Sequence, residues 1–212
     1  RGRIHIVEPD LDFLVREAVQ VGYLQAVTKP ERADVFMVAV PTPFKGDYEP
    51  DLSYIESASK SIAKVLEKGN MVILESTSPV GTTEKMINWM KDVRPDLVFP
   101  KFGEDCPEVD ISVAHCPERV LPGNILQELI KNDRLIGGVT IQCAKRVREF
   151  YKLFVNGECM VTDCRTAELG KLVENAFRDV NIAFANELSL ICEKLNINVW
   201  ELIRLANLHP RV

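Results

Sequence analysis

Short apolar runs rich in β-branched residues recur along the first three quarters of the chain. The clearest, at residues 35–40 and 71–74, are continuous, as expected for strands covered on both faces of a parallel sheet. Similar runs at 111–114, 135–139 and 159–162 predict further strands. The pattern therefore predicts a sheet of several strands.

Helical spacing of apolar residues occurs between these runs. One helix is predicted over residues 9–21, stopped by Gly22, and another over 51–69, with Asp51 as its N-cap. A third is predicted over 144–154. The alternation of strands and helices indicates an α/β protein with a doubly wound sheet.

The later part of the chain has a purely helical pattern. Apolar positions follow the spacing of one helix face and predict a long helix over 166–195 and a second over 199–207. This change predicts a domain boundary between a sheet domain, residues 1–164, and a helical segment, residues 165–212.

A polar stripe lies opposite the apolar face of the long helix. Lys171, Asn175 and Arg178 follow one another at intervals of about one turn. Such a row can hold an anionic ligand or stabilise a developing oxyanion. Taken alone, a solvated helix face explains the stripe as well, and the functional interpretation depends on the segments described below.

Composition excludes several classes of protein. A net charge of −5 provides no basic face for nucleic acid, and no apolar stretch is long enough to cross a bilayer. The six cysteines, at 106, 116, 143, 159, 164 and 192, show no CxxC pair and no metal-ligand spacing. They are expected to be free thiols in a reducing cytosol. The chain begins without a methionine and stops directly after a predicted helix, so we expect a fragment of a longer protein.

Two segments with threonines follow predicted strands. Residues 75–84, ESTSPVGTTE, come after one strand and open a helix, and residues 40–43, VPTP, come after another. Hydroxyls, a glycine and free helical N–H groups at the carboxyl ends of strands are where α/β sheets bind ligands. An ordinary capped turn is the alternative. Two adjacent strand ends of this kind predict a shared crevice.

Seven segments in order resemble the UDP-sugar 6-dehydrogenases of the UDP-glucose/GDP-mannose dehydrogenase family, in particular the branch that acts on UDP-N-acetyl-D-mannosamine. The segments are HIVEPDLD (5–12), AVPTPFKGD (39–47), ILESTSPVGTTE (73–84), CPERVLPG (116–123), LIKNDRLIGG (129–138), RDVNIAFANELSLI (178–191) and NVWELIRLANLHPRV (198–212). No single segment is decisive, but their order makes coincidence a poor explanation.

The resemblance implies an enzyme that uses NAD and a UDP-sugar. It would oxidise the sugar's C6 alcohol to the uronic acid in two hydride transfers, through a covalent adduct on a cysteine, for surface polysaccharide precursors. Residues 1–164 would be a Rossmann-like NAD-binding domain without its first βαβ unit, and 165–212 a helical connector with the start of an all-helical dimerisation domain. A homodimer would form through the long helix 166–195.

The resemblance also implies site residues by matching positions. Lys171 would place a positive charge beside the C6 oxygen and take part in proton transfer, and Asn175 would donate a hydrogen bond to the same region. Thr77 would lie near the nicotinamide and an ordered water. The remaining matches are Thr42 and Thr83 at NAD, Arg119, Val120 and Arg178 at the sugar, and His209 and Arg211 in a substrate-binding segment supplied by the neighbouring subunit.

The chain departs from the family pattern in three ways. The family's GxGxxG turn belongs before Arg1, and its nucleophilic cysteine after Val212, so we expect no activity from the chain alone. None of the six cysteines falls on the nucleophile motif. Pro122 stands where relatives that oxidise UDP-glucose carry the glutamate that activates water for thioester hydrolysis, and Glu118 is the candidate replacement.

Alternative interpretations stay open at this point. Oxidation of another UDP-N-acetylhexosamine or of UDP-glucose is the nearest, although CPERVLPG disfavours UDP-glucose. A hydroxyacid dehydrogenase of the 6-phosphogluconate type shares the Lys-x-x-x-Asn helix but leaves CPERVLPG unexplained. From another class, the chain would be a non-catalytic oligomerisation or nucleotide-sensing module.

Overall fold

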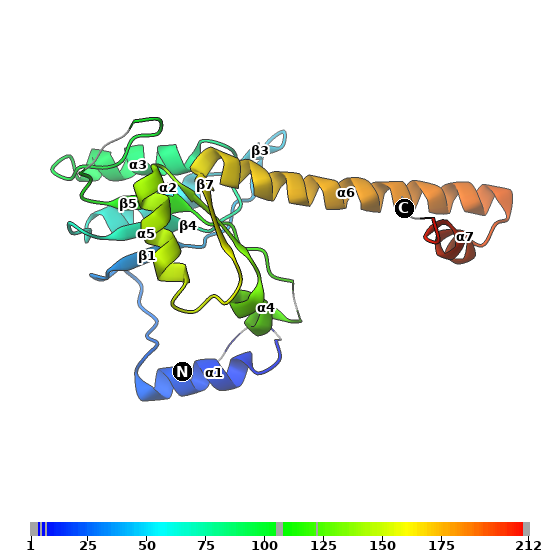
Figure 1. The fold of residues 1–212 in the computed structure, drawn as a ribbon, viewed down its shortest axis with the longest axis horizontal. Helices are drawn as coiled ribbons and strands as arrows, with labels where there is room; N and C mark the ends of the chain where they lie inside the picture. The colour runs from blue at the N-terminus through cyan, green and yellow to red at the C-terminus, as the bar shows by residue number, and fades with distance from the viewer. Residues whose placement is uncertain (1–3, 5, 7, 105–107, 122, 210–212) are drawn as a thin grey trace. The chain divides into compact units, whose positions relative to one another are not determined.

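The computed structural model describes residues 4, 6, 8–104, 108–121 and 123–209. The chain divides into two compact units, residues 1–171 and 172–212, and each is described by itself. The first unit contains a five-stranded sheet with helices on both faces (Figure 1). The second contains helices alone over its described residues, 172–209.

The sheet has the strand order β1-β4-β5-β6-β7. Its strands are β1 (Val35–Val38), β4 (Met71–Leu74), β5 (Ser112–His115), β6 (Arg134–Gly138) and β7 (Cys159–Asp163). The expected parallel pairing of the first two is confirmed, since Val35 lies opposite Met71 and Val38 opposite Leu74. Strand β5 also runs parallel to β4, whereas β6 runs antiparallel to β5 and parallel to β7. The carboxyl ends of β1, β4 and β5 therefore share one edge of the sheet, and those of β6 and β7 lie at the opposite edge.

Two hydrophobic cores cover the two faces of the sheet. Helices α2 (Ser53–Ala63) and α3 (Thr82–Val93) pack over one face, and α5 (Ile141–Tyr151) packs over the other. Side chains of a strand alternate between faces, so Val72 and Leu74 enter the first core while Ile73 enters the second. All three are fully buried, which explains why these strands appear in the sequence as continuous apolar runs.

The helices predicted in the first unit are present with shifted ends. Helix α1 (Leu11–Val21) ends at Gly22, whose φ of 85° allows it to serve as the C-cap. Helix α2 ends at Ala63 rather than at Gly69, because a turn bond from the Val65 N–H to the Ile62 carbonyl replaces the helical pattern.

The starts of α2 and α5 also differ from the prediction. The N-cap of α2 is Leu52 rather than Asp51, although Asp51 Oδ1 accepts the Ser53 N–H at 3.0 Å. Helix α5 begins three residues before the predicted start, since Thr140 Oγ1 accepts the Cys143 N–H at 3.2 Å.

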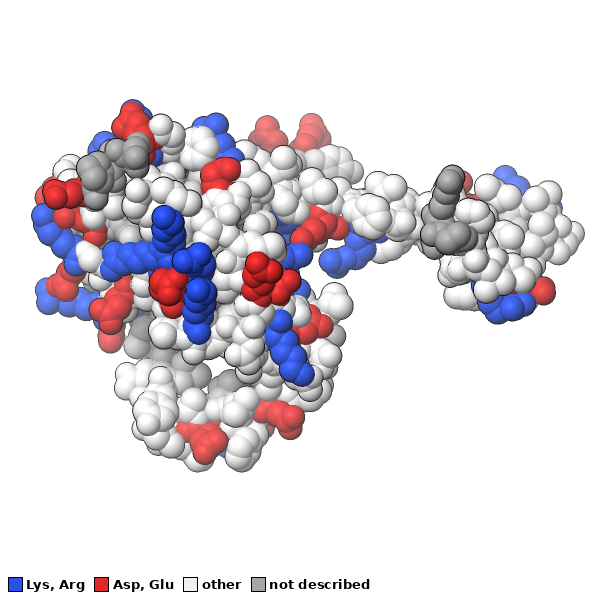
Figure 2. Space-filling view, in the orientation of Figure 1, with Lys and Arg blue, Asp and Glu red and all other residues white. Residues whose placement is uncertain are grey.

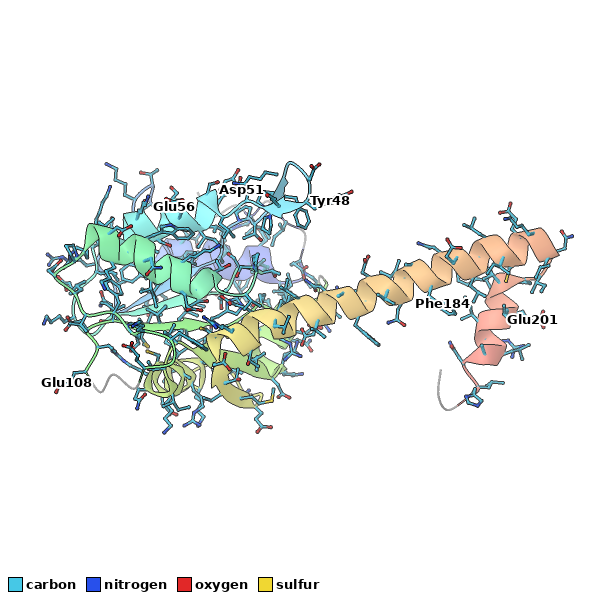
Figure 3. The ribbon with its side chains drawn as sticks, turned by 90° about the horizontal axis from the view of Figure 1, so that it is seen from above. Tyr48, Asp51, Glu56, Glu108, Phe184 and Glu201 are labelled. Atoms are coloured by element: carbon cyan, nitrogen blue, oxygen red, sulfur yellow. The ribbon has the colours of Figure 1, made fainter. Side chains whose placement is uncertain are left out.

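Three short elements were not predicted from the sequence. Helix α4 (Ile125–Lys131) lies between β5 and β6. The strands β2 (Phe44–Lys45) and β3 (Glu49–Pro50) form a separate antiparallel hairpin. Tyr48 at the hairpin tip and Asp51 just after it lie near the start of α2 (Figure 3).

The helical part of the chain agrees with the predicted pattern. Helix α6 spans Cys164–Leu195 and α7 spans Val199–Ala206. Asp163 starts α6 by accepting the Thr166 N–H at 2.9 Å, and Asn198 Oδ1 starts α7 by accepting the Trp200 N–H at 3.0 Å. The boundary between the two compact units falls within α6, after Lys171.

Charged side chains are interspersed on the surface. On the face shown in Figure 2, Lys and Arg side chains alternate with Asp and Glu side chains, and basic side chains cluster over the position of α5. No helix in the described ranges is long and apolar enough to cross a membrane.

Candidate functional site

The ends of β1 and β4 are joined by side-chain hydrogen bonds. Thr42 Oγ1 donates to the Thr77 carbonyl at 2.7 Å. Ser76 Oγ donates to the Val40 carbonyl at 2.7 Å and accepts the Val40 N–H at 2.8 Å. The structure thus brings together Thr42 and Thr77, the two threonines expected at adjacent strand ends. Both are partly exposed at the edge of the sheet where its parallel strands end.

One buried hydroxyl in this loop lacks a partner. Ser78 is 2% exposed, and its Oγ has no hydrogen-bond partner among the residues that the structure describes. Buried polar atoms are normally hydrogen-bonded, so an orphaned hydroxyl next to Thr77 fits a loop that binds a polar ligand. Parallel α/β sheets bind dinucleotides at this edge.

Thr83 lies at the start of α3 and points into the protein. Its side chain is fully buried, and Oγ1 donates to Glu168 Oε1 at 2.6 Å. The Thr83 N–H donates to the same oxygen at 2.8 Å, and the Gly81 N–H donates to Glu168 Oε2 at 2.6 Å. The hydroxyl expected to contact NAD is therefore engaged by a carboxylate of α6.

The polar residues of α6 keep the predicted spacing on one helix. Lys171 is half-buried and is the last residue of the first unit. Asn175 and Arg178 are exposed and belong to the second unit. Residues four apart on a helix share a face, so Lys171 and Asn175 point to the same side of α6.

The segment after β5 is organised around Glu118. Its Oε1 accepts the N–H groups of Arg119 and Val120 at 2.6 and 3.0 Å, and its Oε2 pairs with Arg134 Nη1 at 3.2 Å. The Glu118 carboxylate keeps 36% of its side-chain surface exposed, whereas Arg134 keeps 2%. A cavity of about 300 Å³ lies beside Arg119 and is also lined by Asn132.

A buried polar cluster lies behind this segment. The Tyr151 hydroxyl donates to Glu75 Oε1 at 2.6 Å, and the Arg134 guanidinium lies 5.8 Å from the centre of the Tyr151 ring. Burial raises the pKa of Glu75, an effect opposed by the hydrogen bond from Tyr151. Burial also raises the pKa of the Cys116 thiol to about 12. A thiol of that pKa is protonated at neutral pH and is a poor nucleophile, which agrees with leaving Cys116 without a catalytic role.

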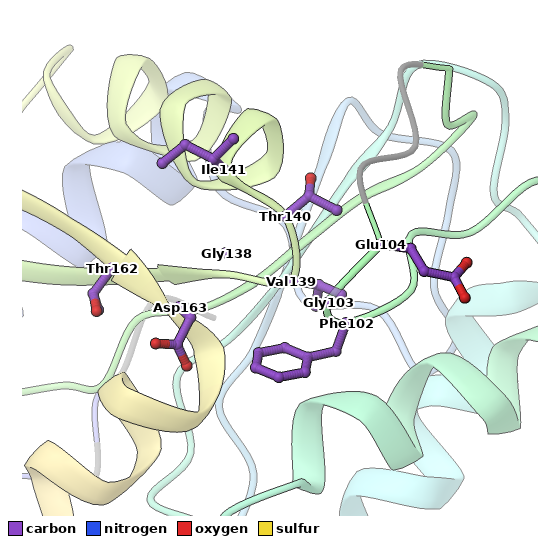
Figure 4. A pocket seen from close by; sticks show the side chains of 9 residues that line it. All are labelled: Phe102, Gly103, Glu104, Gly138, Val139, Thr140, Ile141, Thr162 and Asp163. Atoms are coloured by element: carbon purple, nitrogen blue, oxygen red, sulfur yellow. The ribbon is translucent and has the colours of Figure 1, made fainter.

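A cavity at the opposite edge of the sheet is separate from these residues. It has a volume of about 330 Å³ and lies where β6 and β7 end (Figure 4). Phe102, Thr140 and Asp163 line it. The Asp163 carboxylate is occupied with capping α6, and none of the residues predicted for the site lies on this cavity.

Both parts of the chain match domains of one known family. Residues 1–155 match the NAD binding domain of the UDP-glucose/GDP-mannose dehydrogenase family, and residues 165–212 match the central domain of the same family. The chain belongs to this family.

Individual members of the family match along the whole chain. A UDP-N-acetyl-D-mannosamine dehydrogenase of Yersinia pestis is 66% identical over 212 residues, which is all of this chain and 50% of that protein. An NDP-N-acetyl-D-galactosaminuronic acid dehydrogenase of Ralstonia nicotianae is 63% identical over 213 residues, again covering 100% and 50%. The chain therefore spans about half the length of the curated relatives it matches.

Solved structures of the family share the fold. The UDP-D-ManNAc dehydrogenase of Pyrococcus horikoshii superimposes with a TM-score of 0.89 at 44% identity, covering 100% of this chain and 49% of that one. The UDP-N-acetyl-mannosamine dehydrogenase of Staphylococcus aureus gives a TM-score of 0.86 at 46% identity, covering 100% and 50%. These likenesses confirm the Rossmann-like α/β fold predicted from the sequence.

Not every residue predicted for the site is among the described residues. Arg211 and Pro122 lie outside the described residues, and His209 is exposed at the end of the described chain. Sequence reasoning also missed Glu168, although an acidic residue directly after the apolar Ala167 on the inward face of an amphipathic helix was a signal that it meets a polar partner. No group of three or more metal-ligating side chains occurs within the described part of the chain.

Proposed function

We propose that the complete protein is an NAD-dependent UDP-N-acetyl-D-mannosamine 6-dehydrogenase. The observation that carries the proposal is the 66% identity to a protein of that name along all 212 residues. Within the enzyme, residues 1–164 belong to the NAD-binding domain and 165–212 to the helical connector and central domain. The product would be a uronic acid sugar nucleotide of the kind used in surface polysaccharide synthesis.

The reaction converts the C6 alcohol to a carboxylate in two oxidations. NAD, when bound, accepts a hydride from the C6 carbon in each of them. We assign to Lys171 a positive charge at the C6 oxygen and a share in proton transfer, and to Asn175 a hydrogen bond to the same oxygen. A fixed ammonium and amide stabilise the negative charge that develops there. Their spacing by one turn of α6 supports this pairing.

The cofactor would lie along the edge formed by the ends of β1 and β4. Thr42 and Thr77, joined by a 2.7 Å hydrogen bond, would border it, with the orphaned Ser78 hydroxyl close by. For Thr83, the buried bond to Glu168 supports a role in holding the loop that carries Thr77.

The sugar nucleotide would be held by residues from several segments. Arg119 and Val120 would line the sugar site, and the half-exposed Glu118 carboxylate beside them is our candidate for activating water in the hydrolytic step. The remaining substrate residues are Arg178 from α6 and, from the neighbouring subunit, His209 and Arg211.

We further propose a homodimer formed through the long helix over residues 166–195. Three apolar side chains of α6, Phe177, Val180 and Phe184, are 72, 66 and 67% exposed and recur at helical spacing. A stripe of this kind needs an apolar partner surface, and a second copy of the same helix offers one.

The described cysteines are all unpaired, which supports a reducing, cytoplasmic environment.

A second sugar is favoured by a specific observation. The 63% identity to an NDP-N-acetyl-D-galactosaminuronic acid dehydrogenase is nearly as high as that to the mannosamine enzymes. Oxidation of a UDP-N-acetylgalactosamine derivative is therefore the second candidate function.

An assay of the full-length enzyme with a panel of UDP-sugars tests the proposal. We expect two NADH per sugar and the highest kcat/KM with UDP-N-acetyl-D-mannosamine. A preference for UDP-N-acetylgalactosamine would support the second candidate. UDP-sugar binding without formation of NADH would contradict both and would favour a sensing module.

A further inference from the structure

One buried carboxylate, that of Glu168, ties the start of α6 to the start of α3. It accepts the Gly81 N–H at 2.6 Å, the Thr83 N–H at 2.8 Å and the Thr83 hydroxyl at 2.6 Å. The side chain of Glu168 is fully buried. All three donors belong to the first turn of α3 or its N-cap.

This arrangement satisfies a need of α3 that the helix cannot meet itself. Its N-cap is Gly81, with a φ of 90°, which has no side chain to accept the N–H groups of the first turn. Glu168 supplies the acceptor from a distant part of the sequence. A negative charge is also stabilised at a helix N-terminus, and hydrogen bonds to a charged group are the stronger kind.

The two segments joined in this way carry Thr77, proposed to border the cofactor, and Lys171, proposed to act at the C6 oxygen. Thr77 lies four residues before Gly81 on the loop between β4 and α3, and its carbonyl is fixed by Thr42. Lys171 follows Glu168 by three residues on α6, so the two lie on neighbouring positions of one helix face. The Glu168 carboxylate therefore lies at the join between the loop that carries Thr77 and the helical turn that carries Lys171.

We propose that Glu168 is a positioning residue, which sets the place of the Thr77 loop relative to Lys171 by capping α3 from α6. This inference rests on the function proposed above. Desolvation raises the pKa of Glu168, and its hydrogen bonds from Thr83 and Gly81 act in the opposite direction.

A second tie between the same helices provides a matched control. Arg165 of α6 pairs with Glu84 of α3 through Nε–Oε1 and Nη2–Oε2 contacts of 2.7 and 3.0 Å. These side chains are 50 and 28% exposed, and neither of the two contacts involves the loop before Gly81. Removing the pair loosens the same helix pair without releasing the N-cap of α3.

The test compares Glu168→Gln with Glu84→Gln in the full-length enzyme. The amide introduced by Glu168→Gln keeps the size of the carboxylate but turns an NH₂ donor toward a backbone N–H. We expect kcat to fall about 10- to 100-fold, because a shift of about 1 Å between reacting groups costs up to that much, while KM for UDP-N-acetyl-D-mannosamine stays within about threefold. Glu84→Gln should keep kcat within about twofold. Circular dichroism at the assay temperature is the check that both variants are folded.

The outcomes separate the two proposals. A parent enzyme that oxidises no UDP-sugar overturns the proposed function and the positioning role with it. With an active parent, a folded Glu168→Gln variant whose kcat stays within about threefold overturns the positioning role alone. The positioning role is also overturned if Glu168→Gln changes only KM for the sugar, or if Glu84→Gln lowers kcat by the same factor.

A further variant covers the case in which Glu168→Gln does not fold. Thr83→Val removes one of the three hydrogen bonds and keeps the carboxylate. A lower kcat with unchanged KM for the UDP-sugar supports the proposal, and an unchanged kcat overturns it.

Discussion

The two compact units differ in how far they bury their apolar side chains. Residues 1–171 contain two cores around the sheet, in which positions such as Ile73 and Met86 are fully buried. In the described part of 172–212, Cys192 is the one buried apolar residue, while Phe177 and Trp200 are 72 and 78% exposed. The sheet unit therefore has apolar cores of its own, whereas the described helical unit buries a single apolar side chain and presents an apolar surface.

Helix α6 shows the same contrast along its own length. Cys164, Ala167 and Glu168 in its first turns are fully buried, and Phe184 further along is 67% exposed (Figure 3). The apolar spacing is continuous through both parts, so amphipathic pattern predicts a helix but not what covers it. Chemistry that needs a fixed geometry is expected near the buried part, and assembly is expected through the exposed part.

The largest expected effect is at Lys171, where the first unit ends. In the full-length enzyme, Lys171→Ala should lower kcat by roughly 10² to 10⁴, the usual loss for a positioned acid–base group. Lys194→Ala, in the last turn of the same helix, should leave kcat within about twofold. Steady-state kinetics with the UDP-sugar and NAD measures both. A kcat of the Lys171→Ala enzyme within about threefold of that of the parent would contradict the catalytic role proposed for Lys171.

The next effect tests whether a second copy covers the exposed part of α6. Phe184→Asp should raise the dimer dissociation constant roughly 10³-fold, since a central apolar contact is worth about 2 kcal/mol or more and counts twice in a symmetric dimer. Ser189→Asp adds the same charge at another exposed position, on the opposite face, and should leave the constant nearly unchanged. Sedimentation velocity over a concentration series measures both. Equal dimer dissociation constants of the two variants would show that the apolar stripe is not the dimer contact.

Whether an element could be predicted from the sequence depends on its length rather than on the unit to which it belongs. Strands β1 and β4 and helix α6 were predictable because their apolar patterns are local and long enough to be recognised. Helix α4 has seven residues and the β2–β3 hairpin two residues per strand, too few for a period to be visible. The reversed direction of β6 was not predictable, because an apolar run has the same composition in either direction.

The candidate site divides in a similar way. The meeting of Thr42 and Thr77 was predictable, because adjacent parallel strands end at the same edge of a sheet. The bond from Thr83 to Glu168 joins residues 85 positions apart, and that from Tyr151 to Glu75 joins residues 76 apart. Nothing local in the sequence specifies such pairs, since each depends on how helices pack against the sheet.

A pH effect of intermediate size is expected from the sheet unit alone. His115 on β5 is fully buried, and burial lowers the pKa of its imidazole from the ordinary 6.5 to about 4. Between these values the unfolded chain takes up a proton that the folded chain does not, so the free energy of unfolding falls as the pH falls. The loss should reach about 3 kcal/mol near pH 4.

The control for this effect comes from the helical unit. His115→Gln should flatten the dependence of the unfolding free energy on pH between 6.5 and 4, and His209→Gln, at an exposed position, should keep the slope of the parent. Urea unfolding at a series of pH values measures the slopes. The same slope in the parent and in His115→Gln would show that the buried imidazole does not carry the acid sensitivity.

The smallest effect measures how tightly the sheet unit holds the first turns of α6. A Cβ on Gly137 of β6 would lie 2.5 Å from Ala167 Cβ and 2.8 Å from Cys164 Cα, and backbone atoms cannot move aside as a side-chain end can. Gly137→Ala should therefore lower the free energy of unfolding by about 1–3 kcal/mol, the usual cost of overpacking. At Gly170 the nearest atom to an added Cβ is Leu135 Cδ2 at 3.1 Å, the mobile end of a side chain. Because alanine is favoured over glycine inside a helix by about 1 kcal/mol, Gly170→Ala should be neutral or slightly stabilising. Urea unfolding measures the free energy of unfolding of both variants, each of which adds one methyl group at the contact between β6 and α6. Equal free energies of unfolding would show that the first turns of α6 can shift to make room for the methyl group on Gly137, and so are not held tightly by the sheet.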